Sequence, residues 1–86
     1  MMKVFLSSIA KNDIRLLMRV FNAEKENMGI DFLEDLKVSV GKILNDPEMQ
    51  ETQLGQMVMQ NFPVHIHYIV ESKESLLVTA IFKELN

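Results

Sequence analysis

The stretch FPVHIHYIVESKESLLVTAIF, residues 62–82, decides the fold. Within it, residues 64–71 alternate between apolar and mostly polar side chains, the period of two that is typical of a strand with one buried face. The polar residues 72–74 predict a hairpin turn, and residues 75–82 are almost continuously apolar, as expected of a central strand. This stretch therefore predicts an antiparallel pair of strands inside a sheet.

Before this pair, the apolar spacing changes to three and four residues, which indicates amphipathic helices. The first predicted helix covers residues 8–26, and Ser7 or Ser8 can cap it by accepting hydrogen bonds from free N–H groups. Its apolar stripe is formed by Ala10, Ile14, Leu17 and Phe21 and is widened by Leu16, Met18 and Val20.

A second helix is predicted over about residues 30–44, after a break at Gly29. Glycine adopts the left-handed conformation that a helix exit often needs, so we expect Gly29 to make that turn. The helix should end at Asn45-Asp46-Pro47, because proline cannot continue its hydrogen-bond ladder.

The remaining segments complete a small α+β domain. Residues 2–6 predict a first strand, residues 48–53 a polar loop, and residues 53–61 a weaker strand. The order is β-α-α-β-β-β, which indicates two layers: a helical hairpin packed on a small, mainly antiparallel four-stranded sheet. At 86 residues, the chain is expected to form one domain, 1–86.

Composition excludes several classes of function. A net charge of −3 and a pI of about 5.3 argue against direct nucleic-acid binding, because such proteins are usually basic. The absence of cysteine excludes disulfides and thiolate metal sites. No apolar run is long enough for a membrane span and the start does not resemble a signal peptide, so we expect a cytoplasmic protein without membrane contact.

The candidates for chemistry lie on or near the strand of residues 64–71. His65 and His67 project to the same side about 7 Å apart, and Glu71 is a third potential metal ligand. Two histidines without cysteine are a weak metal motif, so half-exposed histidines are the favoured interpretation, and no metal or cofactor is expected. His65, His67, Tyr68 and Glu71 are also weak candidates for acid–base cleavage of RNA, although these strands lack the arginine and lysine that stabilise a phosphorane. Tyr68 alternates onto the face of Val64 and Ile66, so we expect it to pack in the core.

Two further sets of residues are candidates for binding a partner protein. Lys11, Arg15 and Arg19 recur every four residues along the first helix, which indicates either a solvated face or a patch for an acidic segment. Met57 and Met59 point the same way from a strand expected at a sheet edge. They therefore indicate a docking site for a strand or helix or, equally, ordinary core packing.

Four segments in order resemble one protein family. They are residues 6–14 with Ser7, Ala10 and Asp13-Ile14; residues 29–47 with Asp31-Phe32-Leu33 and Asn45-Asp46-Pro47; residues 62–70, similar to the pattern Phe-Pro-Tyr-x-Ile-x-Tyr-x-Val; and residues 77–82. On these segments the chain resembles the RelE/ParE superfamily of toxins from bacterial type II toxin–antitoxin systems, and more its ParE branch. The resemblance implies the β-α-α-β-β-β fold derived above.

The resemblance also implies a toxin of the plasmid-stabilisation type, neutralised by a cognate antitoxin whose C-terminal segment wraps it. RelE-like members cut mRNA on the ribosome, whereas ParE-like members poison DNA gyrase. The chain departs from the RNA-cleaving pattern at Gln56, Gln60, Asn61 and His65, where relatives often carry arginine, and it keeps only Lys83 as a base near its end.

These departures favour a non-enzymatic, ParE-like toxin that binds a protein target such as DNA gyrase. The first alternative is a RelE-like endoribonuclease that uses His65, His67 or Glu71 as acid or base and Lys83 or Arg15 on phosphate. The second is a divergent inactive member that acts only as a binding module. Enzymatic activity, the choice between gyrase and ribosome, and the formation of a homodimer stay open from the sequence.

Overall fold

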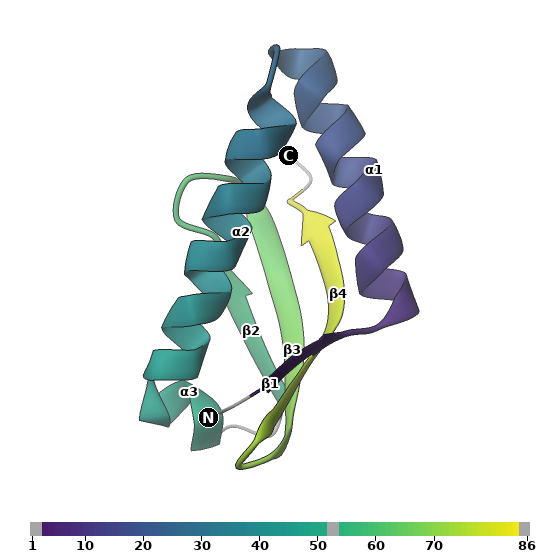
Figure 1. The fold of residues 1–86 in the computed structure, drawn as a ribbon. Coiled ribbons are helices and arrows are strands. Elements are labelled where there is room, and N and C mark those ends of the chain that lie inside the picture. Colours follow the sequence, from purple (N-terminus) through teal and green to yellow (C-terminus); the bar gives the residue numbers. More distant parts are fainter. Residues whose placement is uncertain (1–2, 52–53, 85–86) are drawn as a thin grey trace.

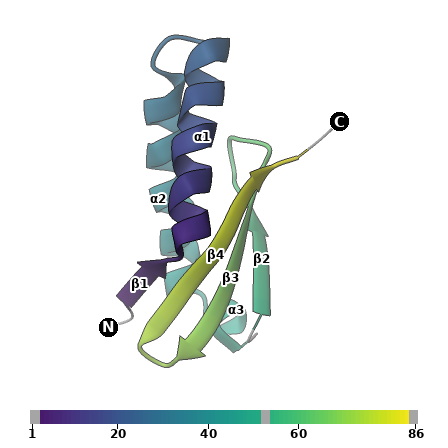
Figure 2. The same cartoon turned by 90° about the vertical axis from the view of Figure 1, so that its right-hand side faces the viewer.

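The computed structural model describes residues 3–51 and 54–84 and confirms the two-layer α+β architecture. Its elements are β1 (Lys3–Leu6), α1 (Ser8–Glu24), α2 (Met28–Asn45), α3 (Pro47–Glu51), β2 (Leu54–Val58), β3 (Val64–Ser72) and β4 (Ser75–Lys83). The helices α1 and α2 form an antiparallel hairpin on one face of the sheet (Figure 1), and within the described ranges no helix covers the opposite face (Figure 2). No helix in these ranges is long and apolar enough to cross a bilayer.

The sheet has the strand order β1-β4-β3-β2. The strands β3 and β4 are central and antiparallel, and β2 pairs antiparallel with β3 at one edge, as the sequence predicts. At the other edge β1 runs parallel to β4. Parallel neighbours need a long crossover connection, and here the helical hairpin belongs to the chain that separates β1 from β4.

Three phenylalanine rings join the two layers. Phe21 of α1, Phe32 of α2 and Phe62 before β3 contact one another with ring centroids 4.9–5.7 Å apart, in tilted and edge-on arrangements that aromatic pairs favour.

The buried stripe of α1 is narrower than predicted, because Leu16 is 48% and Val20 42% exposed.

The turn between α1 and α2 corrects the expectation for Gly29. Asn27, not Gly29, adopts the left-handed conformation, with φ of 64°. Asparagine tolerates this conformation better than most residues with a side chain. Gly29 lies in the first turn of α2, where its N–H donates to Asn22 Oδ1 at 2.7 Å and where an added Cβ would lie 2.8 Å from the Met18 carbonyl oxygen. Gly29 therefore permits the close approach of the two helices.

The predicted polar loop at 48–53 is also wrong in part. Residues 47–51 form α3, with Pro47 at the first helical position and the Asp46 carboxylate accepting the Glu48 N–H at 3.0 Å. Proline suits this position because the N–H it lacks has no partner there anyway.

The boundaries of two other elements differ slightly from the prediction: α1 ends at Glu24 instead of residue 26, and β2 is shorter than the predicted 53–61. Residues 2, 52 and 53 lie outside the described ranges.

The start of α1 continues along the edge of β4 where β1 stops. Ser7 caps α1 by accepting the Ala10 N–H at 2.9 Å, and its hydroxyl donates to the Thr79 carbonyl at 2.8 Å. The Asp13 carboxylate accepts the Ile81 N–H at 3.0 Å. The side chains of Ser7, which caps α1, and of Asp13 within α1 thus satisfy backbone groups of β4 that a longer β1 would have paired.

Candidate partner-binding site

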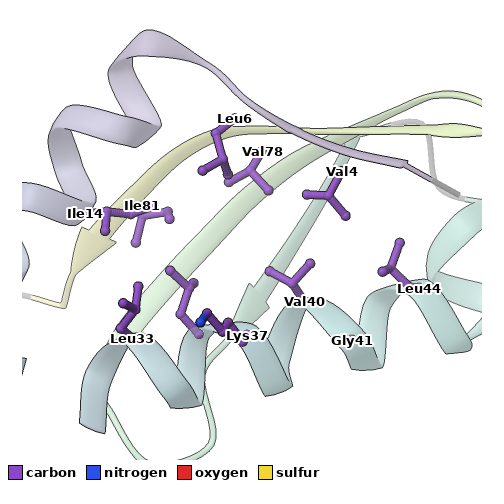
Figure 3. Close-up of a pocket in the computed structure, with 11 residues that line it drawn as sticks. Val4, Leu6, Ile14, Leu33, Lys37, Val40, Gly41, Leu44, Val78 and Ile81 are labelled. Atoms are coloured by element: carbon purple, nitrogen blue, oxygen red, sulfur yellow. The ribbon is translucent and has the colours of Figure 1, made fainter. Parts of the chain in front are cut away.

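An apolar groove opens between α2 and the β1 edge of the sheet (Figure 3), with a volume of about 360 Å³. Val40 and Leu44 of α2 point toward Val4 of β1, and Val78 and Ile81 of β4 also line the groove. The groove exists because Leu33, Val40 and Leu44 only pack partly against the core.

The β1 strand offers its backbone as well as its side chains beside this groove. The N–H groups of Lys3 and Ser7 donate to carbonyls of Glu74 and Val78, so the N–H and C=O groups of Val4 and Leu6 point away from β4. Among the described residues no strand pairs with this outer edge. An unpaired edge next to an apolar groove is a template for a strand or segment of another chain.

Basic side chains lie near the groove. Lys37 of α2 lines it (Figure 3), and Ile14 of α1 lines it from the other helix. Around the axis of α1, Lys11 lies about 60°, Arg15 about 100° and Arg19 about 140° from Ile14. All three basic residues of α1 are exposed, and none forms an ion pair with a residue in the described ranges. Lys11 is therefore the predicted basic residue best placed to reach a ligand in the groove.

The two histidines lie on the opposite, open face of the sheet. The His65 ring stacks on Phe82 with centroids 5.1 Å apart, and the His67 ring meets Phe82 edge-on at 4.7 Å. His65 Nδ1 is 2.6 Å from Gln56 Nε2, and its Nε2 is 4.0 Å from the Glu84 carboxylate. The pair therefore packs around one aromatic ring.

His67 has a further unusual feature, because its Nε2 is buried without a hydrogen-bond partner in the part of the chain that the structure describes. No group of three His, Cys, Asp or Glu side chains suited to a metal ion occurs in residues 3–51 and 54–84.

The other two catalytic candidates are remote from His65. The Lys83 ammonium is 3.0 Å from the Glu24 carboxylate and lies over the Phe21 ring at 5.5 Å, which places it on the helix side of the sheet. Glu71 is exposed and lies six residues along β3 from His65, a distance of about 20 Å. The four candidates do not converge on a single cleft.

The two methionine candidates differ in access. Met59 is 3% exposed and belongs to the hydrophobic core, whereas Met57 is half-buried and packs partly against that core. Both follow or lie in β2, which is an edge strand as predicted. Only Met57 has surface available to a partner.

Tyr68 packs in the core, in agreement with its position in the alternating pattern. Its hydroxyl donates to the Met49 carbonyl of α3 at 3.4 Å, and its ring lies over Gly55, where an added Cβ would clash with the ring. Burial raises the pKa of Tyr68, and the negative charge of Asp46 raises it further. The neutral phenol of Tyr68 therefore connects α3 to the sheet through its hydrogen bond to the Met49 carbonyl.

Comparison with known proteins supports this architecture. No family model and no curated protein sequence matches the chain. Among solved structures, the chain is similar to one from the chromosomal ParDE TA system of P. aeruginosa, with 15% identity and a TM-score of 0.76 over 99% of this chain and 98% of that chain. The chain therefore shares the fold of that chain, in agreement with the β-α-α-β-β-β fold that the resemblance to the RelE/ParE superfamily implies. At this identity the likeness concerns the fold.

The groove itself is what sequence reasoning missed. Val4 is predicted only as part of a strand and Leu33 only as part of a helix, and Lys37 carries no prediction of its own, yet all three line the groove. One signal was available: Gly41 sits inside α2, where glycine costs about 1 kcal/mol relative to alanine. Gly41 lines the groove, and an added Cβ there would have no atom within 4 Å.

Proposed function

We propose that this protein is a ParE-like toxin of a type II toxin–antitoxin system, which acts in the cytoplasm by binding a protein target such as DNA gyrase and is neutralised by a cognate antitoxin. The observation that carries the proposal is the apolar groove beside the unpaired edge of β1. The fold shared with a chain of a ParDE system supports the same interpretation.

The groove has the properties needed to hold a segment of an antitoxin. The outward N–H and C=O groups of Val4 and Leu6 can pair with an extended segment, and the apolar lining can bury its side chains. Lys37 and the nearby Lys11 favour a segment that carries acidic residues, because complementary charges orient a partner and speed its association. An acidic, amphipathic segment is therefore the expected ligand.

The environment of the histidines supports action by binding over RNA cleavage. Cleavage of RNA needs a cation close to the phosphate to stabilise developing charge. The groups found near His65 are instead Gln56, Phe82 and the acidic Glu84, and the Lys83 ammonium is engaged on the other side of the sheet.

Expression of the protein alone and together with the product of its neighbouring small gene tests the proposal. We expect the free protein to arrest growth and alter plasmid supercoiling, while messenger RNA stays intact, and we expect co-expression to restore growth. The His65→Ala variant should keep this toxicity, since no proton transfer is involved. Intact growth and supercoiling with the free protein would refute the toxin, and His65-dependent cleavage of transcripts would establish the endoribonuclease alternative.

A further inference from the structure

The outer strand β2 lacks the features that usually protect a sheet edge. Natural edge strands carry charges, prolines or bulges that prevent pairing with other chains. The five residues of β2, Leu54–Val58, contain no charge and no proline. Leu54 is 71% and Val58 51% exposed, and no strand among the described residues pairs with the outer edge of β2.

The hydrogen bonds inside the sheet fix the direction of each backbone group of β2. The Met59 N–H donates to the Val64 carbonyl of the neighbouring strand at 2.9 Å. Directions alternate along a strand, so the N–H and C=O groups of Gly55 and Met57 also point inward. Those of Leu54, Gln56 and Val58 consequently point outward to the free edge.

We propose that β2 pairs antiparallel with β2 of a second copy of this chain, with Gln56 opposite Gln56 of the second copy. In this register Leu54 lies opposite Val58 of the second copy. Each opposed residue then has its N–H and C=O groups directed at the partner strand, so every outward group of the edge gains a partner. The two four-stranded sheets become one continuous sheet around a two-fold axis.

Side chains and charges favour a second copy as the occupant. On the open face, apolar Leu54 meets apolar Val58 across the strands, and the two Gln56 amides meet each other. The five residues of β2 carry no charge, so two copies of this strand can lie side by side without repulsion between like charges.

This contact is independent of the proposed antitoxin groove. β1 and β2 are opposite edges of the sheet, so pairing through β2 leaves the groove beside β1 open. Two strands of five residues bury less than the roughly 1,200 Å² of a standard stable interface. We therefore expect a dimer that dissociates on dilution.

Cysteine crosslinking tests the register, because the chain contains no cysteine of its own. Residues in a hydrogen-bonded antiparallel pair have Cα atoms about 5.5 Å apart, within the range that a disulfide bridges. The Gln56→Cys variant should therefore form a disulfide-linked dimer under mild oxidation. In the matched Val58→Cys variant the two cysteines would be about 13 Å apart, so that variant should remain largely uncrosslinked.

Sedimentation over a range of concentrations provides a second measurement. Gln56→Pro removes an outward N–H and no inner ladder bond, so it should abolish the concentration-dependent dimer while thermal unfolding stays cooperative. Gln56→Ala loses the same amide contact with His65 but keeps the N–H, and it should still dimerise. A wild-type monomer at every concentration, or equal crosslinking at positions 56 and 58, would overturn the proposal. If β2 pairs only with a different protein, the wild-type protein will likewise be a monomer at every concentration, and this result overturns the proposal of a second copy.

Discussion

At the scale of single residues, two glycines of α2 have opposite roles. An added Cβ at Gly29 would lie 2.8 Å from both the Met18 carbonyl and Asn22 Oδ1, whereas one at Gly41 would meet no atom within 4 Å. Sequence alone does not separate them, because their difference depends on how closely another helix approaches. A side chain at position 41 therefore fits into the folded protein without a clash, whereas one at position 29 does not.

The paired substitutions Gly29→Ala and Gly41→Ala test this difference. Overpacking at a closed helix contact typically costs about 1–3 kcal/mol, so Gly29→Ala should lower the free energy of unfolding by that order. Gly41→Ala should raise it by about 0.5–1 kcal/mol, because alanine loses less backbone entropy in a helix. Chemical denaturation of both variants measures these changes, and equal effects of the two substitutions would contradict the described helix packing.

At the scale of elements, the strands were easier to predict than the short helix α3. The predicted alternation in residues 64–71 is confirmed. Val64, Ile66 and Tyr68 are buried, because one face of β3 is covered and the other is open. α3 was predicted to be loop because its polar composition hides a capping arrangement of Asp46 before Pro47. The position of α3 depends on a tertiary hydrogen bond from Tyr68, which no local pattern reveals.

The attachment of α3 should weaken in alkaline solution. Burial and the Asp46 charge raise the pKa of Tyr68 above its usual value of 10.0, so the folded protein holds this proton more tightly than the unfolded chain. The stabilisation is complete below the unfolded pKa and is lost as the pH rises through the folded pKa. Tyr68 is the single tyrosine of the chain, so phenolate absorbance reports its titration directly.

The control for this titration is Tyr68→Phe, which should unfold with a smaller dependence on pH above about 10. A phenolate transition at or below that pH in the folded protein would show that the ring is not held as described.

At the scale of the whole molecule, the two edges of the sheet and its open face are the surfaces that connect fold to function. The order β1-β4-β3-β2 places the groove at one edge and the uncharged strand β2 at the other. The motif order predicts the layers and the central strands. It does not predict the groove, because the groove combines residues of β1, α1, α2 and β4 whose spacing in the chain has no common period.

The most direct test of the account is the affinity of the groove for the product of the neighbouring small gene, measured by titration calorimetry with three variants at Gly41. Gly41→Glu places a negative charge at the groove and should weaken binding of an acidic segment at least about tenfold, equivalent to about 1.4 kcal/mol. Gly41→Lys adds a side chain of comparable length with the opposite charge and should bind more tightly than Gly41→Glu, and Gly41→Ala should bind like the wild type. Equal affinities for all variants, with the partner still bound, would contradict the groove as the antitoxin site.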